Sequence, residues 1–216
     1  MMVTVAYAVL RAIVGGFAKL YWRLTIEGRE NLPTSGAYVL APVHRSNVDT
    51  PLAALLTRRR MRFIAKDSLW KFAPFGWFIS TFGGFPVRRG MADRDALLRC
   101  LAVVNAGHPL VMFPEGTRRE GPVIEDLFHG PAFVASRAGV PVVPVGIGGS
   151  ARTMPRGAKF IRPVKIHIVI GPPMQPPPPD EGTGRVTREA HRKMTADIQG
   201  ELQRLFDLAE ARVGGS

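Results

Sequence analysis

Short apolar runs alternate with helical patterns along this chain. Several runs have the length and composition of buried strands, and they cover residues 37–43, 61–65, 85–88, 109–113, 141–145 and 164–170. Helical spacing of apolar positions is found in residues 68–72, 93–106, 131–138 and 187–212, and a further helix is predicted to open at Pro51. Because strands alternate with helices, the sequence predicts an α/β fold: a single domain with a mixed, mostly parallel sheet flanked by helices.

The last apolar run, residues 164–170, alternates partly between polar and apolar positions. Alternation of this kind indicates a strand with one partly exposed face. We therefore expect His167 to be a surface residue of that strand. A stiff proline-rich connector at residues 172–179 then leads to the C-terminal helix at 187–212.

The N-terminal segment predicts a helix with one apolar face. Arg11 and Lys19 interrupt the apolar residues 3–22, so no uncharged run reaches the roughly 20 residues that span a bilayer. On a helical projection, the basic residues share one side and leave the other to Val3, Tyr7, Leu10, Ile13, Val14 and Phe17. We assign residues 1–26 to an amphipathic helix in a membrane interface, with packing on the domain as the alternative, and residues 27–216 to the main domain.

The balance of charged residues favours an acidic partner. The chain has 29 Lys and Arg against 17 Asp and Glu, a net charge of +12, which is typical of proteins that meet nucleic acid, phosphorylated substrates or anionic membranes. The single cysteine, Cys100, excludes an internal disulfide and a multi-cysteine metal site. Its place in an apolar helical segment indicates core packing.

His44 and Asp49 form the most informative polar pair. Residues five apart on a regular helix point about 140° away from each other, so these side chains can converge only on a loop. The apolar run 37–43 ends directly before His44, and a helix opens at Pro51 with Asp49 or Thr50 as its cap. Since α/β sheets place their chemistry at the carboxyl ends of strands, the pair is a candidate base with its orienting carboxylate. A loop whose side chains only cap backbone groups is the alternative.

Two arginine-containing segments follow later strands. Residues 82–90 include Arg88, and residues 111–119 read VMFPEGTRR. A guanidinium group suits phosphate because its planar fork donates two parallel hydrogen bonds. Gly116 would let backbone approach a ligand closely, and Thr117 adds a hydroxyl donor. At strand ends beside a histidine, these segments predict an anion site more readily than a solvated surface.

Aromatic residues concentrate between residues 70 and 85, with Lys66 and Lys71 beside them. Their rings can form core, but they also suit the wall of an apolar tunnel or a membrane-contacting surface. The candidates for an acyl-sized apolar pocket are Trp70, Phe72, Phe75 and Phe85.

Four segments in order resemble the sequence blocks of the glycerophospholipid acyltransferase family, and in particular its 1-acylglycerol-3-phosphate acyltransferases. They are HRSNVD at 44–49, FPVR at 85–88, FPEGTR at 113–118 and VPVVPV at 140–145. The resemblance implies an α/β acyltransferase domain at residues 27–216 and association with membranes. It also implies transfer of a fatty acyl group from a thioester to lysophosphatidate, which yields phosphatidate.

The resemblance also implies roles for individual residues. It makes His44 the general base and Asp49 the carboxylate that orients it, and it adds Pro144 to the residues that shape the acyl pocket. Phosphate binding and placement of the acceptor fall to residues of the second and third blocks: Arg88, Glu115, Gly116, Thr117 and Arg118. His129 stands where a lysine is common in the family, which puts a cationic role at that position in doubt.

The implied chemistry uses no metal and no cofactor apart from a co-substrate, acyl-CoA or acyl-carrier protein. A histidine accepts the proton of the acceptor hydroxyl while its oxygen attacks the thioester. Backbone N–H groups of the loop and helix start are the expected oxyanion donors. The expected partners are lysophosphatidate and a phospholipid surface, without nucleic acid, for a peripheral protein on the cytoplasmic face of the cell membrane.

Other functions fit the sequence less well. The glycine-rich stretch at 146–151 satisfies a loose dinucleotide fingerprint, but Pro155 interrupts the helix that it should open and no acidic residue follows at the required distance. Nucleic-acid binding rests on the charge, and no recognised binding module is present. A lipid-binding relative without catalysis would not need both His44 and Asp49. Another acceptor, glycerol 3-phosphate or a different lysophospholipid, stays open.

Overall fold

The computed structural model of the protein describes residues 2–87, 93–155 and 157–214. Its strands form one sheet with the order β1-β7-β6-β2-β5-β3-β4, and all neighbours are parallel except β6 and β7. The mixed, mostly parallel sheet predicted from the sequence is therefore confirmed. The strands are β1 (Thr25–Glu27), β2 (Val39–Pro42), β3 (Arg62–Lys66), β4 (Gly84–Val87), β5 (Leu110–Val111), β6 (Val142–Gly148) and β7 (His167–Ile170).

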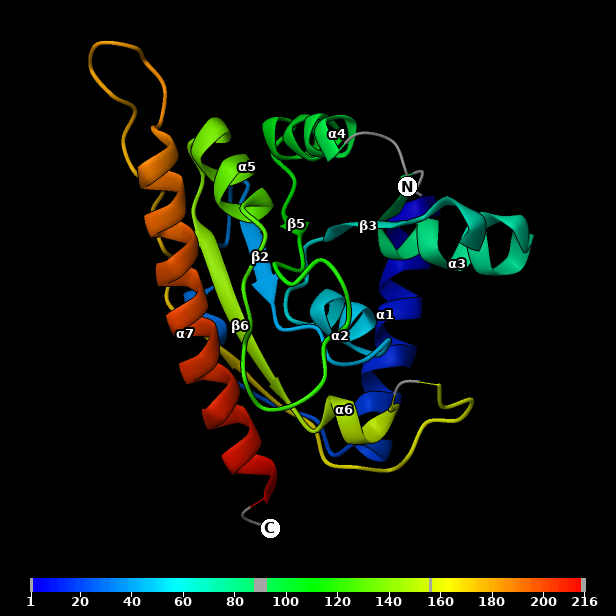
Figure 1. Ribbon diagram of the computed structural model, residues 1–216. Helices are drawn as coiled ribbons and strands as arrows, with labels where there is room; N and C mark the ends of the chain where they lie inside the picture. Colours follow the sequence, from blue (N-terminus) through cyan, green and yellow to red (C-terminus); the bar gives the residue numbers. More distant parts are fainter. Residues whose placement is uncertain (1, 88–92, 156, 215–216) are drawn as a thin grey trace.

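Helices flank this sheet in two groups (Figure 1). In one group α7 packs along β6 and β7, with α5 and α4 beside it, and in the other α1 packs on α2 and α3. The α-helices are α1 (Met2–Tyr21), α2 (Asp49–Leu55), α3 (Ala73–Phe82), α4 (Asp93–Asn105), α5 (Gly130–Ala138), α6 (Ser150–Thr153) and α7 (Arg188–Gly214). Two short 3₁₀ helices, η1 (Arg29–Asn31) and η2 (Asp67–Lys71), complete the described elements.

The central strands are buried along their whole length, as in β2 and β6. Parallel strands covered on both faces read as continuous apolar runs, which explains why the sequence located them. β7 is also buried throughout, and His167 is only 4% exposed. The expectation of a surface histidine is wrong because β7 lies between β1 and β6 beneath α7, where Thr25 Oγ1 contacts the ring Nδ1 at 2.6 Å.

The strand β1 and the helix α3 were not predicted, and neither were the short elements η1 and α6. β1 is only three residues long and contains two polar side chains, so it carries no apolar run. The segment predicted as helix at 68–72 forms η2, and the longer helix α3 follows it. Pro74 in the first turn of α3 and the left-handed Gly83 at its end, with φ 107°, are ordinary signals for a helix start and stop.

The helix α1 does not present the faces predicted for it. Arg11 turns toward the domain and donates hydrogen bonds to the carbonyls of Leu55 and Thr57, both at 2.9 Å. Tyr7, predicted on the apolar side, is buried beside Arg11, whereas Lys19 of the basic side is exposed. The two predicted sides therefore do not separate buried from exposed residues. The large apolar side chains that α1 exposes are those of Val5, Val9, Ile13, Phe17 and Leu20. β1 begins at Thr25, so the division expected between residues 26 and 27 falls inside a strand of the sheet.

Several arginines bind backbone carbonyls inside the domain. Arg11 and Arg29 both reach the end of α2, where Arg29 donates to the Leu56 carbonyl at 2.6 Å. Unpaired carbonyls at a helix C-terminus attract cations, which accounts for this placement. Arg60 donates to the Thr81 carbonyl at 3.1 Å, and burial lowers the pKa of Arg29 and Arg60 below the ordinary value. Part of the net positive charge therefore stabilises the fold rather than recruiting a partner.

Cys100 lies on α4 with no exposed surface, as the sequence indicated, and burial raises the pKa of its thiol to about 12. The thiolate is the reactive form, so we expect alkylation by iodoacetamide at pH 8 to be at least ~100-fold slower in the native protein than in denaturant. Mass spectrometry of timed samples measures both rates. Equal rates would show that the Cys100 side of α4 is open to solvent.

Candidate functional site

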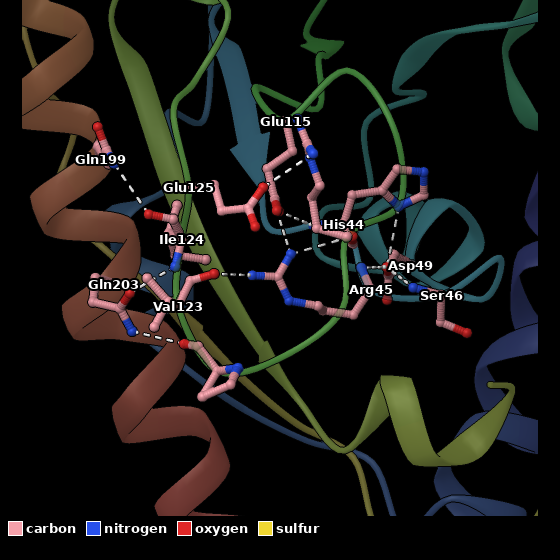
Figure 2. A network of polar contacts seen from close by, with 12 residues as sticks. His44, Arg45, Ser46, Asp49, Glu115, Val123, Ile124, Glu125, Gln199 and Gln203 are labelled. Carbon is pink, nitrogen blue, oxygen red and sulfur yellow. Dashed lines mark hydrogen bonds and ion pairs between the residues drawn. The ribbon is translucent and has the colours of Figure 1, made fainter. Parts of the chain in front are cut away.

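The site forms where β2 ends and α2 begins. His44 is the second residue after β2, and its Nδ1 lies 3.2 Å from Asp49 Oδ2 (Figure 2). Asp49 is fully buried, and the same Oδ2 accepts the backbone N–H groups of Arg45 at 2.7 Å and Ser46 at 2.6 Å. The two predicted residues are thus brought together on a strand-to-helix loop by a carboxylate that three donors hold in place.

The expectation that Asp49 or Thr50 caps α2 is wrong. The N-cap residue is Val48, which makes no side-chain capping bond. The Asp49 carboxylate turns back over the loop, because the N–H groups of Arg45 and Ser46 converge on it. These two N–H groups are consequently not available as oxyanion donors. Any oxyanion donors from this loop must therefore be other backbone N–H groups.

Phe113 orients the His44 ring from its other side. The two rings stack with centroids 4.0 Å apart and planes 24° apart. Because Asp49 engages Nδ1, the remaining nitrogen Nε2 is the one that can take a proton from a substrate. The His44 side chain is 17% exposed, so it is held firmly but stays open to a ligand.

The loop after β5 lies against the His44 loop. Glu115 is 1% exposed, and its Oε1 accepts the His44 backbone N–H at 2.8 Å. The Arg119 N–H donates to the His44 carbonyl at 2.9 Å. The structure therefore brings the third sequence block beside the first, with Thr117 exposed and Arg118 half-buried at the edge.

Gly116 allows the tight turn within this loop. Its φ is 64°, a left-handed conformation that side chains disfavour, and a Cβ atom there would lie 2.6 Å from the ring of Phe128. A larger residue would strain the backbone at Gly116 and would push aside the exposed ring of Phe128. Arg88, the phosphate-binding candidate of the second block, lies outside the described residues.

The acyl-pocket candidates do not form one cluster. Phe72 and Phe75 are 67% and 43% exposed, whereas Trp70 and Phe85 are half-buried beside η2, α3 and β4. Pro144 is buried in β6, next to β2 in the sheet. β6 and β4 are four strand positions apart, or roughly 19 Å at the usual spacing, so Pro144 lies well away from the aromatic residues.

Sequence reasoning missed several residues that build the site. Arg45 and Phe113 contact the predicted pair directly, and Arg45 stood inside the quoted first block. Gln199 and Gln203 of α7 reach the segment that follows the third block, and nothing in their local sequence signals this contact.

Comparisons with known proteins place the chain among acyltransferases. An acyltransferase family model matches residues 23–148, which include all four sequence blocks. The chloroplastic 1-acyl-sn-glycerol-3-phosphate acyltransferase BAT2 of Brassica napus is 30% identical over 158 residues, which cover 71% of this chain and 46% of that protein. The 1-acyl-sn-glycerol-3-phosphate acyltransferase of Bacillus subtilis (strain 168) is 26% identical over 170 residues, 78% of this chain and 79% of that protein.

A solved structure has the same fold. The crystal structure of the 1-acyl-sn-glycerophosphate acyltransferase PlsC from Thermotoga maritima matches with a TM-score of 0.71 at 25% identity, over 90% of this chain and 77% of that chain. The chain spans about half the length of the first curated relatives, 44% to 55%.

Proposed function

Because the chain belongs to the glycerophospholipid acyltransferase family, we propose that it transfers a fatty acyl group from a thioester to the free hydroxyl of 1-acylglycerol 3-phosphate, yielding phosphatidate. One observation carries this proposal. Asp49 and Phe113 orient the His44 ring. The backbone carbonyl of His44 is hydrogen-bonded to the loop that carries Arg118. A base and an anion-binding loop thus lie side by side.

In the proposed mechanism, His44 acts as a general base. Its Nε2 accepts the proton of the acceptor hydroxyl while that oxygen attacks the thioester carbonyl carbon, which contributes about 10²–10⁴-fold to the rate. Asp49 holds the ring through Nδ1 and stabilises the imidazolium that forms. The tetrahedral intermediate then loses the thiolate, which takes the proton back from the imidazolium. No acyl-enzyme and no cofactor is part of this mechanism, and acyl-CoA or acyl-carrier protein is the co-substrate.

The acceptor phosphate is proposed to bind beside Thr117 and Arg118, with Gly116 shaping the loop and Arg88 as a further cation from the sequence. Glu115 takes a different role, since its carboxylate is buried and faces His44 and Arg45 rather than the edge of the loop. The partly buried rings of Trp70 and Phe85 remain the proposed contacts for an acyl chain.

A comparison of acceptors tests the proposed substrate. Kinetics with one acyl donor and three acceptors (lysophosphatidate, glycerol 3-phosphate and a lysophospholipid without a phosphate monoester) would give kcat/KM for each. We expect lysophosphatidate to exceed the lysophospholipid by about 10–100-fold, because charged hydrogen bonds contribute ~1.5–3 kcal/mol. A higher kcat/KM for either other acceptor would contradict the assignment.

We also propose that the protein associates peripherally with anionic phospholipid at the cytoplasmic face of the cell membrane, through α1. The side chains of Val5, Val9, Ile13, Phe17 and Leu20 leave one side of α1 apolar and exposed, and Lys19 and Arg23 are exposed at its end. Apolar side chains beside basic residues suit an anionic membrane interface. Among the described residues, no helix combines the length and apolarity required to cross a bilayer.

Polar replacements on α1 test this surface. Val9 and Ile13 are 54% and 63% exposed, so V9Q with I13Q should leave the fold intact. Sedimentation with phosphatidylglycerol vesicles should show partition reduced at least about tenfold, since each buried apolar side chain contributes ~1.5–3 kcal/mol. L208Q on α7, where Leu208 is 43% exposed, is the matched control and should bind like the unaltered protein. An equal loss of vesicle binding in the α1 double variant and in L208Q would show that the membrane contact is not on this side of α1.

A further inference from the structure

A buried ion pair lies directly behind the proposed base. Arg45 and Glu115 are each 1% exposed at their side chains, and Arg45 Nη1 donates to Glu115 Oε2 (Figure 2). The other carboxylate oxygen accepts the His44 backbone N–H at 2.8 Å. One carboxylate therefore binds both the backbone of the base and the side chain of the residue that follows it.

The surroundings of Arg45 exclude a direct role in substrate binding. Its Nη2 donates to the Val123 carbonyl at 3.2 Å, and its guanidinium lies over the ring of Phe206 of α7, 5.0 Å from the centroid. Burial of a charge is unfavourable unless it is paired and hydrogen-bonded; Arg45 is paired with Glu115 and both of its Nη atoms donate hydrogen bonds, while its Nε has no hydrogen-bond partner among the described residues. Arg45 and Glu115 consequently act through their neighbours.

The segment after the phosphate-binding loop is held by α7 as well. Gln203 accepts the Ile124 N–H at 2.7 Å and donates to the Pro122 carbonyl at 3.0 Å. Gln199 donates to the Ile124 carbonyl at 3.0 Å. Figure 2 shows these contacts beside the Arg45 to Val123 bond, so the segment is fixed between the base loop and α7.

We propose that Arg45, Glu115 and Gln203 are positioning residues that set the place of the loop at residues 116–118 relative to His44, and thereby the binding of a phosphorylated acceptor. This inference rests on the proposed function. Arg45 and Glu115 connect the His44 loop to the loop after β5, and Gln203 holds the segment 122–124 that Arg45 also binds through the Val123 carbonyl. Their hydrogen bonds go to residues other than Thr117 and Arg118. Removing their hydrogen bonds should weaken binding of the acceptor more than binding of the donor thioester.

The experiment compares steady-state KM values for the two substrates. In Q203A the catalytic pair and Arg118 are unchanged, and two hydrogen bonds to the segment are lost. We expect KM for lysophosphatidate to rise about fivefold to tenfold, with KM for acyl-CoA within about twofold. E115Q removes the charge but keeps an oxygen for the His44 N–H, and should raise the same KM further. R204Q is the matched control, because Arg204 pairs with Glu201 on the exposed side of α7.

A purely structural role gives a different result. Loss of folded protein lowers kcat in proportion and leaves both KM values unchanged, so unchanged KM values in Q203A would overturn the inference even if E115Q fails to fold. An R204Q variant that behaves like Q203A would also overturn it. Failure of the proposed function is distinct, since the unaltered protein would then form no phosphatidate at all.

Discussion

The H44A variant is expected to transfer acyl groups about 10²–10⁴-fold more slowly than the unaltered protein, because the acceptor hydroxyl loses the base that takes its proton. The effect should appear in kcat, with little change in KM for lysophosphatidate, since the phosphate contacts stay in place. Initial rates with acyl-CoA, measured by free-thiol release and phosphatidate formation, give both values. Near-wild-type turnover in H44A would remove His44 from the mechanism.

A companion variant separates orientation from simple loss of the ring. D49N keeps the shape of the side chain and an oxygen for the Arg45 and Ser46 N–H groups, but removes the charge that stabilises the imidazolium. A loss of up to about 10⁴-fold is expected by comparison with other His and Asp pairs. If circular dichroism and thermal unfolding of H44A and D49N stay close to those of the unaltered protein, the lower rates come from the catalytic step and not from loss of folded protein.

Among the variants proposed for this protein, E115A is expected to show the largest decrease in the free energy of unfolding. The side chain of Glu115 is 1% exposed, and its removal leaves the buried guanidinium of Arg45 without its carboxylate. Breaking a buried pair in this way costs about 3–5 kcal/mol. Urea unfolding followed by circular dichroism measures the difference in the free energy of unfolding. A difference below about 1 kcal/mol would show that water reaches Arg45 and that the pair is not buried in solution.

A double variant tests the physical reason for that loss. Replacing both partners, R45M with E115L, removes the unpaired charge and should restore most of the stability, because buried pairs and apolar residues of similar volume are often equivalent. Acceptor binding should stay weak, since neither replacement can hold the His44 N–H or the Val123 carbonyl. A double variant as unstable as E115A would show that packing, not charge, accounts for the loss.

The fold was largely predictable because its central strands leave a direct trace in the sequence. β2 and β6 are buried on both faces and read as continuous apolar runs, whereas β1 has three residues with two polar side chains and leaves no such trace. The orientation of α1 depended on a contact far away in sequence. Arg11 reaches the carbonyls at the end of α2, and no helical projection can anticipate that a basic side chain will point inward.

The part of the candidate site whose residues are close in sequence was predictable. His44 and Asp49 are close in sequence and meet on a loop whose limits the flanking strand and helix define. Arg45 looked like an ordinary basic residue, and only the tertiary structure shows that Glu115, Val123 and Phe206 surround it. The contacts of Gln203 depend on how α7 packs, which local patterns do not report.

One measurement tests the central claim most directly. The purified protein is incubated with acyl-CoA carrying a ¹³C-labelled acyl chain and with lysophosphatidate, and the lipids are quantified by mass spectrometry beside the free thiol. The proposed function predicts labelled phosphatidate in a one-to-one ratio with released thiol, and both should form at least about 100-fold more slowly in H44A. Thiol release without labelled phosphatidate would contradict acyl transfer and indicate a thioester hydrolase.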